Sequence, residues 1–313
     1  MRSLRIFWFI LGLLALVGGV VTLQTMLPLG RGFEAFFGGG LALLVAGTLL
    51  LWKKRLIIRL LSLSSLAPAH FASPRQVSIL LPVLNESPNL RACLAAITIP
   101  AEIPTEIVVI DGGSSDDTPV IAAQDPRVRL VHSPRGRGTQ IAKGYEVAQG
   151  DLLLILHADS RLQPNTINDI WNHCLLNPHV AGGACTARYE HSDPRFRLSE
   201  FLNDLRVRWF GITFGDQVQF FRRAAVPPAQ FPDFKLMEDI ELSLRIQHAG
   251  TMALVRTKVI ASHRRWVKVG FTRNTVEVIG LSVAYLVLRG FGLVKDKGER
   301  FYQYYYFPNN GKN

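Results

Sequence analysis

The sequence begins with two long stretches that carry no charged side chain. They cover residues 6–27 and 35–52, and a short link with Pro28 and Gly30 separates them. As α-helices they would be about 33 Å and about 27 Å long, close to the thickness of a bilayer core. We therefore expect a transmembrane helical hairpin within residues 1–55. A cleaved signal peptide and a buried hairpin of a soluble protein are the alternatives.

Basic residues flank this hairpin at both of its outer ends. Arg2 and Arg5 precede the first stretch, and Lys53, Lys54 and Arg55 follow the second. Because basic flanks favour the cytoplasmic side, both ends should face the cytoplasm. We expect a multi-pass protein of the cell (inner) membrane with its catalytic domain in the cytoplasm.

The composition narrows the class of protein further. Hydrophobic residues make up 48% and charged residues 19% of the chain, which is not typical of a disordered protein. The three cysteines cannot form a disulfide framework, and none lies in a CxxC pair, so a structural zinc site is not expected. The net charge of +11 fits contact with anionic lipid, and no motif typical of nucleic-acid binding accompanies it.

Downstream of the hairpin, short apolar runs alternate with helical segments. The apolar, β-rich runs cover residues 77–81, 106–110, 128–131 and 152–156. Strands that alternate with helices indicate an α/β fold with a mostly parallel sheet, buried on both faces. We expect this domain over residues 76–270, after an interfacial segment and linker over residues 56–75.

Polar residues stand directly after several of these strands, where α/β sheets bind their ligands. Asp111 can accept hydrogen bonds from a base or ribose, and Gly112 allows a close backbone approach. Asp159 follows another strand and can hold Mg²⁺ or Mn²⁺, which prefer oxygen ligands. Each acid alone is more typical of a turn or a helix cap. No P-loop or dinucleotide fingerprint is present.

Three segments resemble family 2 glycosyltransferases with the GT-A (nucleotide-diphospho-sugar transferase) fold in their order and spacing. They are VSILLPVLNES from Val77, IVVIDGGSSDDT from Ile107 and GDLLLILHADS from Gly150. Within that family, the chain is similar to a bacterial group associated with arsenosugar biosynthesis or with radical-SAM and selenodomain proteins. This narrower similarity lies in GRGTQ at 136–140, HAD at 157–159, GDQ at 215–217 and LMEDIEL at 236–242.

The resemblance implies roles for individual residues. The nucleotide sugar would be bound by Pro82, Glu86, Asp111, Gly112, Arg137, Asp159 and Arg265. A divalent cation, Mg²⁺ or Mn²⁺, would be held by Asp159, with His157 and His263 near it. His157 stands where the family has the first acid of its DxD motif, and imidazole is a poorer ligand for a hard cation than carboxylate.

Further residues are implied in acceptor binding and catalysis. Asp239 is the expected general base and Glu238 the second candidate, because the attacking hydroxyl must lose its proton. Acids at a helix start also interact favourably with the helix dipole, which is the alternative role for this pair. Asp216, Gln217 and Trp266 would bind the sugar or the acceptor; a turn before a strand is the alternative for the first two. Ser262 replaces the glutamine of the QxxRW motif of processive members, whereas Arg265 and Trp266 match it.

The carboxyl end returns to apolar character. The run over residues 278–288 is short for a span, so residues 271–313 are expected to form a membrane-interface helix and an aromatic, basic tail. A third membrane crossing is the alternative.

Together these features predict a membrane-anchored, inverting, metal-dependent glycosyltransferase. It would transfer a sugar from a nucleotide-diphosphate-sugar to the hydroxyl of a lipid-like or small soluble acceptor. The alternatives are a nucleotidyltransferase and a catalytically inactive, nucleotide-sugar-binding scaffold of the same fold, for which His157 is the best argument. Membrane lipid is an expected partner, and nucleic acid is not.

Overall fold

The computed structural model describes residues 69–290, 292–294 and 298–306. The expected transmembrane hairpin and most of the interfacial segment lie outside the described residues. Of the described residues, 69–275, 294 and 298–306 belong to one compact unit, which holds the sheet. From Val276 to Gly290, helix α10 belongs to a second unit and is described by itself.

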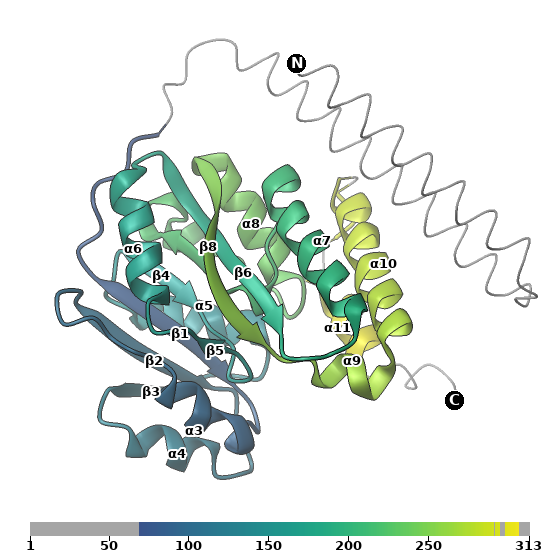
Figure 1. Cartoon of the computed structure of the whole chain (residues 1–313), viewed down its shortest axis with the longest axis horizontal. Helices are drawn as coiled ribbons and strands as arrows, with labels where there is room; N and C mark the ends of the chain where they lie inside the picture. Colours follow the sequence, from purple (N-terminus) through teal and green to yellow (C-terminus); the bar gives the residue numbers. More distant parts are fainter. Residues whose placement is uncertain (1–68, 291, 295–297, 307–313) are drawn as a thin grey trace, which may run out of the picture. The chain divides into compact units, whose positions relative to one another are not determined.

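An eight-stranded sheet forms the centre of this unit, in the order β3-β2-β1-β4-β7-β6-β8-β5 (Figure 1). Its strands are β1 (Val77–Val83), β2 (Thr105–Asp111), β3 (Val128–His132), β4 (Leu152–Ile155), β5 (Arg161–Leu162), β6 (Val180–Tyr189), β7 (Gln219–Arg222) and β8 (Thr251–Ala261). Strands β1 to β4 pair in parallel, and so do β6 and β8. Strand β7 is antiparallel to β4 and β6, and β5 is antiparallel to β8. The predicted α/β fold with a mostly parallel sheet is confirmed.

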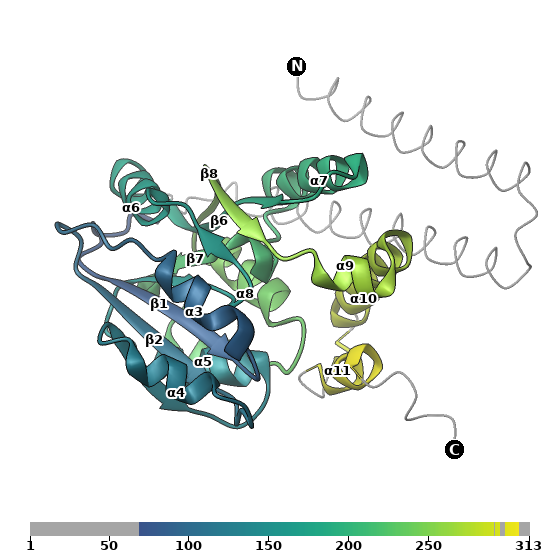
Figure 2. The same cartoon turned by 60° about the horizontal axis from the view of Figure 1, so that its bottom comes forward.

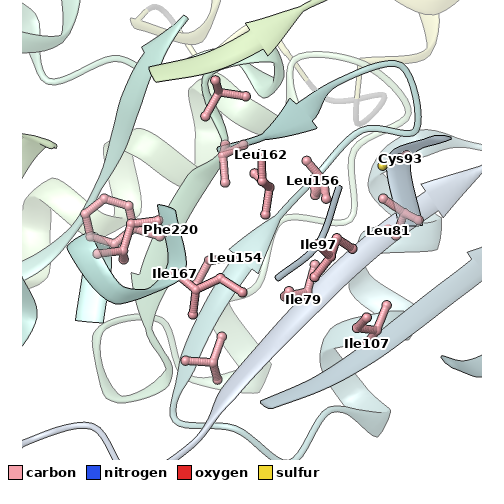
Figure 3. Packing of buried hydrophobic residues seen from close by; sticks show 14 of the residues in the cluster. Ile79, Leu81, Cys93, Ile97, Ile107, Leu154, Leu156, Leu162, Ile167 and Phe220 are labelled. Carbon is pink, nitrogen blue, oxygen red and sulfur yellow. The ribbon is translucent and has the colours of Figure 1, made fainter. Parts of the chain in front are cut away.

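Helices cover both faces of this sheet. One face packs against α3 (Ser87–Ala95), α4 (Thr118–Gln124) and α6 (Thr166–Leu176), and the other against α5 (Arg137–Val147) and α8 (Glu238–Ala249). Within β1, Ile79 and Leu81 point to the first face, whereas Leu80 points to the second. Figure 3 shows the first of these layers, where Ile79, Leu81 and Phe220 lie among side chains from the helices. Strands β1 and β4 are buried on both faces and are almost entirely apolar. Each large apolar side chain buried there stabilises the fold by about 1.5–3 kcal/mol.

Helix α7 (Pro194–Phe210) follows β6 and has clear boundaries in the sequence. Asp193 caps its start by accepting the N–H of Arg195 at 2.9 Å, and Pro194 occupies the first turn. Gly211 ends the helix in the left-handed region at φ 62°. In Figure 1, α7 lies alongside β6.

The chain leaves β8 through α9 (Arg264–Val269), seen at the end of that strand in Figure 2, and continues as α10 (Phe271–Gly290) and α11 (Glu299–Tyr306). Helix α10 starts at Phe271, seven residues before the apolar run at Val278 that the sequence indicated. With 20 residues and a mean hydropathy of 1.2 over its best window, it is long and apolar enough to cross a membrane. It is the one such helix in the part of the chain that the structure describes. The interfacial helix and the third crossing both stay predictions.

Candidate active site

The loop after β2 is organised by Asp111. Its side chain is almost fully buried, and its carboxylate accepts the N–H groups of Gly113 and Ser114 at 3.1 Å. Gly113 has φ 86°, a conformation that favours glycine. Asp111 therefore holds the shape of the loop at this strand end.

Gln140 ties the ends of β1 and β2 together. Its Nε2 donates to the carbonyl oxygens of Val83 and Ile110, each at 2.8 Å. A Cβ at Gly112 would lie 2.8 Å from the amide carbon of Gln140, so glycine is needed there for this side chain to approach. Gln140 belongs to the GRGTQ segment, but the sequence did not indicate this role. The remaining predicted residue of β1, Pro82, is buried within the strand and pairs in register with Ile110.

Arg264 links two of the predicted site carboxylates. Its Nη2 donates to Oδ2 of Asp159 at 3.1 Å and lies 3.5 Å from Oε2 of Glu86. Glu86 also accepts from the side-chain amide of Asn89 at 2.6 Å. The carboxylates follow β1 and β4, so the start of α9 reaches across the ends of two strands.

The neighbouring arginine, which the sequence favoured, makes other contacts. Nε of Arg265 donates to Oδ1 of Asn274 at 3.0 Å, and its guanidinium lies 3.7 Å from the ring centroid of Tyr305. The sequence favoured Arg265 in the basic segment after β8, whereas Arg264 is the member of this segment that contacts Asp159. Only the helical geometry of α9 distinguishes the two positions.

A small cavity brings together His157, Gly215, Glu238 and Asp239. A Cβ at position 215 would overlap Nε2 of His157, so glycine is required beside this ring. Burial lowers the pKa of His157 to about 4, which keeps the imidazole neutral at physiological pH.

Asp239 is held at the start of α8 by two backbone groups. Its Oδ2 accepts the N–H of Gly215 at 3.3 Å, and its Oδ1 accepts the N–H of Ile240 at 2.8 Å. Met237, directly before the helix, has φ 66°. This left-handed residue turns the chain so that the two acids occupy the first turn.

Glu238 is paired with Arg137 from the GRG segment, 101 residues earlier in the chain. A Cβ at Gly138 would overlap the carbonyl oxygen of Phe234, so this glycine allows the two loops to meet. Glu238 is 5% exposed, and burial raises the pKa of its carboxyl group. Its Oε2 is buried without a hydrogen-bond partner within the described residues.

The GDQ segment divides into two environments. Gln217 is fully buried, accepts from Nη2 of Arg206 at 2.6 Å and donates to the carbonyl of Cys185 at 3.4 Å. Asp216 accepts the hydroxyl of Tyr189 at 2.7 Å, and burial raises the pKa of Asp216. Gln217 therefore supports the structure, in contrast to its predicted contact with sugar or acceptor. Tyr189 had no motif in the sequence to mark it.

Trp266 and His263 lie in an aromatic group beside Tyr189. The ring centroid of Trp266 is 6.0 Å from Tyr189 and 5.8 Å from Phe196. His263 lies 5.1 Å from the ring of His191. Trp266 thus adjoins the Asp216 side of the site, whereas His263 faces aromatic rings.

A divalent cation at this site would need ligands from the substrate in addition to those from the protein. Among the described residues, no three His, Cys, Asp or Glu side chains are grouped to hold an ion. Mg²⁺ in nucleotide-using enzymes is usually held by one or two carboxylates, substrate phosphates and water. Asp159 fits that arrangement as a single protein ligand. His157 is a poor partner for it because the ring is packed against Gly215.

Residues 78–237 match the sequence profile of glycosyl transferase family 2. The chain belongs to this family. Uncharacterized protein MT1568 of Mycobacterium tuberculosis (strain CDC 1551 / Oshkosh) is 32% identical over 220 residues, covering 61% of this chain and 68% of that protein. Undecaprenyl-phosphate 4-deoxy-4-formamido-L-arabinose transferase of Yersinia pestis (strain Pestoides F) is 30% identical over 154 residues, or 45% of this chain. The match spans about half of that relative's length, 46%.

Solved structures share the fold of this family 2 glycosyltransferase. Glucosyl-3-phosphoglycerate synthase from Mycobacterium tuberculosis, in complex with Mn²⁺, UDP and glucosyl-3-phosphoglycerate, has a TM-score of 0.51 at 18% identity, and the match covers 71% of this chain and 82% of that chain. A mannosyltransferase from Pyrobaculum calidifontis, in complex with GDP-Man and Mn²⁺, has a TM-score of 0.52 at 21% identity. This match covers 79% of our chain and 74% of the mannosyltransferase. The sequence-based identification of a family 2 glycosyltransferase that uses a nucleotide sugar is supported, and the nucleotidyltransferase and scaffold alternatives are not favoured.

Proposed function

We propose that this glycosyltransferase transfers a sugar from a nucleotide-diphosphate-sugar to a hydroxyl of a lipid acceptor at the cytoplasmic face of a membrane, with inversion at the anomeric carbon. The observation that carries the catalytic part is the position of Asp239. Its carboxylate is oriented by the N–H groups of Gly215 and Ile240 in a cavity that also contains His157, two residues from Asp159. Asp239 therefore shares a cavity with the first residue of the HAD segment, which also contains Asp159.

In the proposed reaction, the acceptor oxygen attacks the anomeric carbon while the bond from that carbon to the diphosphate oxygen breaks. The proton of the hydroxyl passes to Asp239, and the negative charge leaves with the nucleoside diphosphate. Arg264 is placed to exchange its carboxylate partners for the diphosphate. A Mg²⁺ or Mn²⁺ ion bound at Asp159 would stabilise the same developing charge.

Glu238 has a different proposed role. Its ion pair with Arg137 joins the start of α8 to the GRG loop, so we assign it to positioning Asp239. Asp111 and Glu86 remain the proposed contacts for the base and ribose, from the loops after β2 and β1.

The lipid acceptor is supported by several independent features. One relative named above is an undecaprenyl-phosphate sugar transferase. The net charge of +11 suits an anionic membrane, and α10 has the length and composition of a membrane span. The resemblance to the arsenosugar-associated group would instead favour a small soluble acceptor. Partitioning of radiolabelled product into organic solvent, and not into water, is the result expected for a lipid.

The proposal includes the domain limits and the orientation of the chain. Residues 1–55 would anchor the protein, residues 56–75 connect it, residues 76–270 carry the catalysis, and residues 271–313 contact the membrane interface. Alkaline phosphatase fused into the link near Gly30 should be active, and the same enzyme fused at the carboxyl end should be inactive. The reverse pattern would contradict the cytoplasmic placement.

The catalytic proposal is tested with Asp239→Asn, which keeps the shape of the side chain and removes the base. Turnover should fall by about 10²–10⁴-fold, the usual contribution of general base catalysis, while the nucleotide-sugar Kd is retained. Asp117→Asn, at an exposed acid in the loop before α4, serves as the control with unchanged turnover. Full turnover by Asp239→Asn would exclude this base. Release of nucleoside diphosphate, and not pyrophosphate, identifies glycosyl transfer.

A further inference from the structure

A second cavity lies beside the catalytic site, between the start of α7 and α9. Its volume is about 230 Å³, and its walls include Phe196, Trp266, Val267 and Phe271. The rings form a continuous surface, with centroid separations of 4.8 Å between Trp266 and Phe271 and 5.2 Å between Phe196 and Phe271. We propose that this cavity binds the apolar chain of the acceptor lipid, an inference that rests on the proposed function.

The polar groups of the cavity already bond to one another. Arg195 pairs with Asp193 and lies 5.0 Å from the ring centroid of Phe271, and the N–H of Asp193 donates to Nδ1 of His191 at 3.1 Å. A sugar needs several donors and acceptors from its site, whereas a hydrocarbon needs only apolar contact. The volume is also below the roughly 300–1,000 Å³ of ordinary small-molecule pockets, so a segment of a chain fits it better than a whole polar ligand.

A series of side-chain and backbone contacts connects this cavity to the proposed base. Phe196 and Trp266 adjoin the ring of Tyr189, at 5.3 Å and 6.0 Å between centroids. The hydroxyl of Tyr189 donates to Asp216, and the N–H of the preceding Gly215 donates to Asp239. A lipid whose chain lies in the cavity would thus have its polar end directed towards Asp239.

The cavity also adjoins surfaces suited to lipid. Phe271 is the first residue of α10, the helix that is long and apolar enough to cross a bilayer. Val267 on its wall is 65% exposed, and α7 also exposes Leu198 and Phe201 by 57% and 62%. Exposed apolar side chains of this kind mark contacts with membranes or partners. They favour a ligand that enters from a membrane over one that enters from water.

The experiment uses the full chain in phosphatidylcholine nanodiscs and farnesol with a diazirine at the end of its chain. After photolysis, the labelled peptides should contain residues 191–196 or 264–271, and excess unlabelled farnesol should suppress the labelling. Suppression by a water-soluble glycoside alone, or labelling confined to other segments, would overturn the proposal.

Val267→Trp is designed to fill the cavity from its exposed wall without disturbing the core. Labelling of the cavity peptides should fall by about tenfold, equivalent to about 1.4 kcal/mol of binding free energy. Val120→Trp is the matched control, because it adds the same ring in place of an exposed valine of α4, outside the cavity. Equal labelling of Val267→Trp and the wild type would overturn the assignment.

A parallel titration of the wild type with UDP- and GDP-sugars separates this inference from the proposed function. Binding of a nucleotide sugar together with unchanged labelling of Val267→Trp rejects only the cavity. Absence of any nucleotide-sugar binding rejects the proposed function itself.

Discussion

The half of the sheet built from β1 to β4 can be recognised from local sequence motifs, whereas the half built from β6 to β8 depends on contacts between distant segments. In the first half, apolar strands end in short loops whose acids and glycines mark the site directly in the sequence. In the second half, the long strands β6 and β8 contain small and polar residues, and their positions depend on contacts with distant segments. Local motifs therefore mark the first half, the proposed donor side, while long-range packing defines the second half, the proposed acceptor side.

Among the substitutions that test this difference, we expect the largest loss of stability at Arg222. It is 3% exposed, and its guanidinium donates to the carbonyl oxygens of Val180, Cys174 and Ala72. Arg222→Met would leave these acceptors without partners, at about 1–3 kcal/mol for each that stays buried. Chemical denaturation should show a loss of several kcal/mol. Exposed Arg91→Met in the donor half should change stability by less than about 0.5 kcal/mol, and equal effects would break the comparison.

The pH dependence of stability should reveal His157 at the junction of the two halves. Its pKa is about 4 in the folded protein and near 6.5 when unfolded. The stabilisation from the neutral ring is therefore complete above pH 6.5 and declines as the pH falls towards 4. Between pH 6.5 and 4 the free energy of unfolding should fall by about 3 kcal/mol in the wild type and by less in His157→Gln. Chemical denaturation at several pH values measures this free energy. If it changes equally with pH in the wild type and in His157→Gln, the burial of the ring is contradicted.

Replacing a glycine with alanine should destabilise the protein for a different reason in each half. A Cβ at Gly183 in β6 would overlap the carbonyl oxygen of Ala253 in β8, so Gly183→Ala should cost about 1–3 kcal/mol through overpacking. Gly113 has no atom within 4 Å of such a Cβ but has φ 86°, so Gly113→Ala should cost about 1 kcal/mol through backbone strain. Melting temperatures measure both. A larger loss for Gly113→Ala than for Gly183→Ala would contradict close approach as the stronger of the two constraints.

The smallest expected effect concerns the contact between the halves. Arg264 is half exposed, and its ion pairs with Glu86 and Asp159 should each contribute less than about 1 kcal/mol. Arg264→Ala should weaken UDP binding without metal by a few-fold and strengthen binding of Mn²⁺ alone by a similar factor. Isothermal titration measures both quantities. No change in either would exclude Arg264 as the counter-ion of this site.

Much of the donor side was predictable from local signals. Strands β1 to β4 were located within one or two residues, and the loops with Glu86, Asp111 and Asp159 were identified because polar residues interrupt apolar runs. Strand β6 was not predicted, since Gly182, Gly183 and neighbouring alanines weaken the β-strand pattern. Those glycines are needed because β6 approaches β7 and β8 closely, and a single sequence does not reveal which strands will be neighbours.

The order of residues alone was sufficient to predict the α/β architecture and the family and to propose acids for catalysis, because apolar periodicity and strand-end motifs are local properties. Only the folded chain decided that Arg264 and not Arg265 meets Asp159, that Glu238 pairs with Arg137 and that Gln217 is buried. Those outcomes depend on the direction of side chains brought together across as many as 105 residues. Such directions arise from the packing of whole elements, which no short segment encodes.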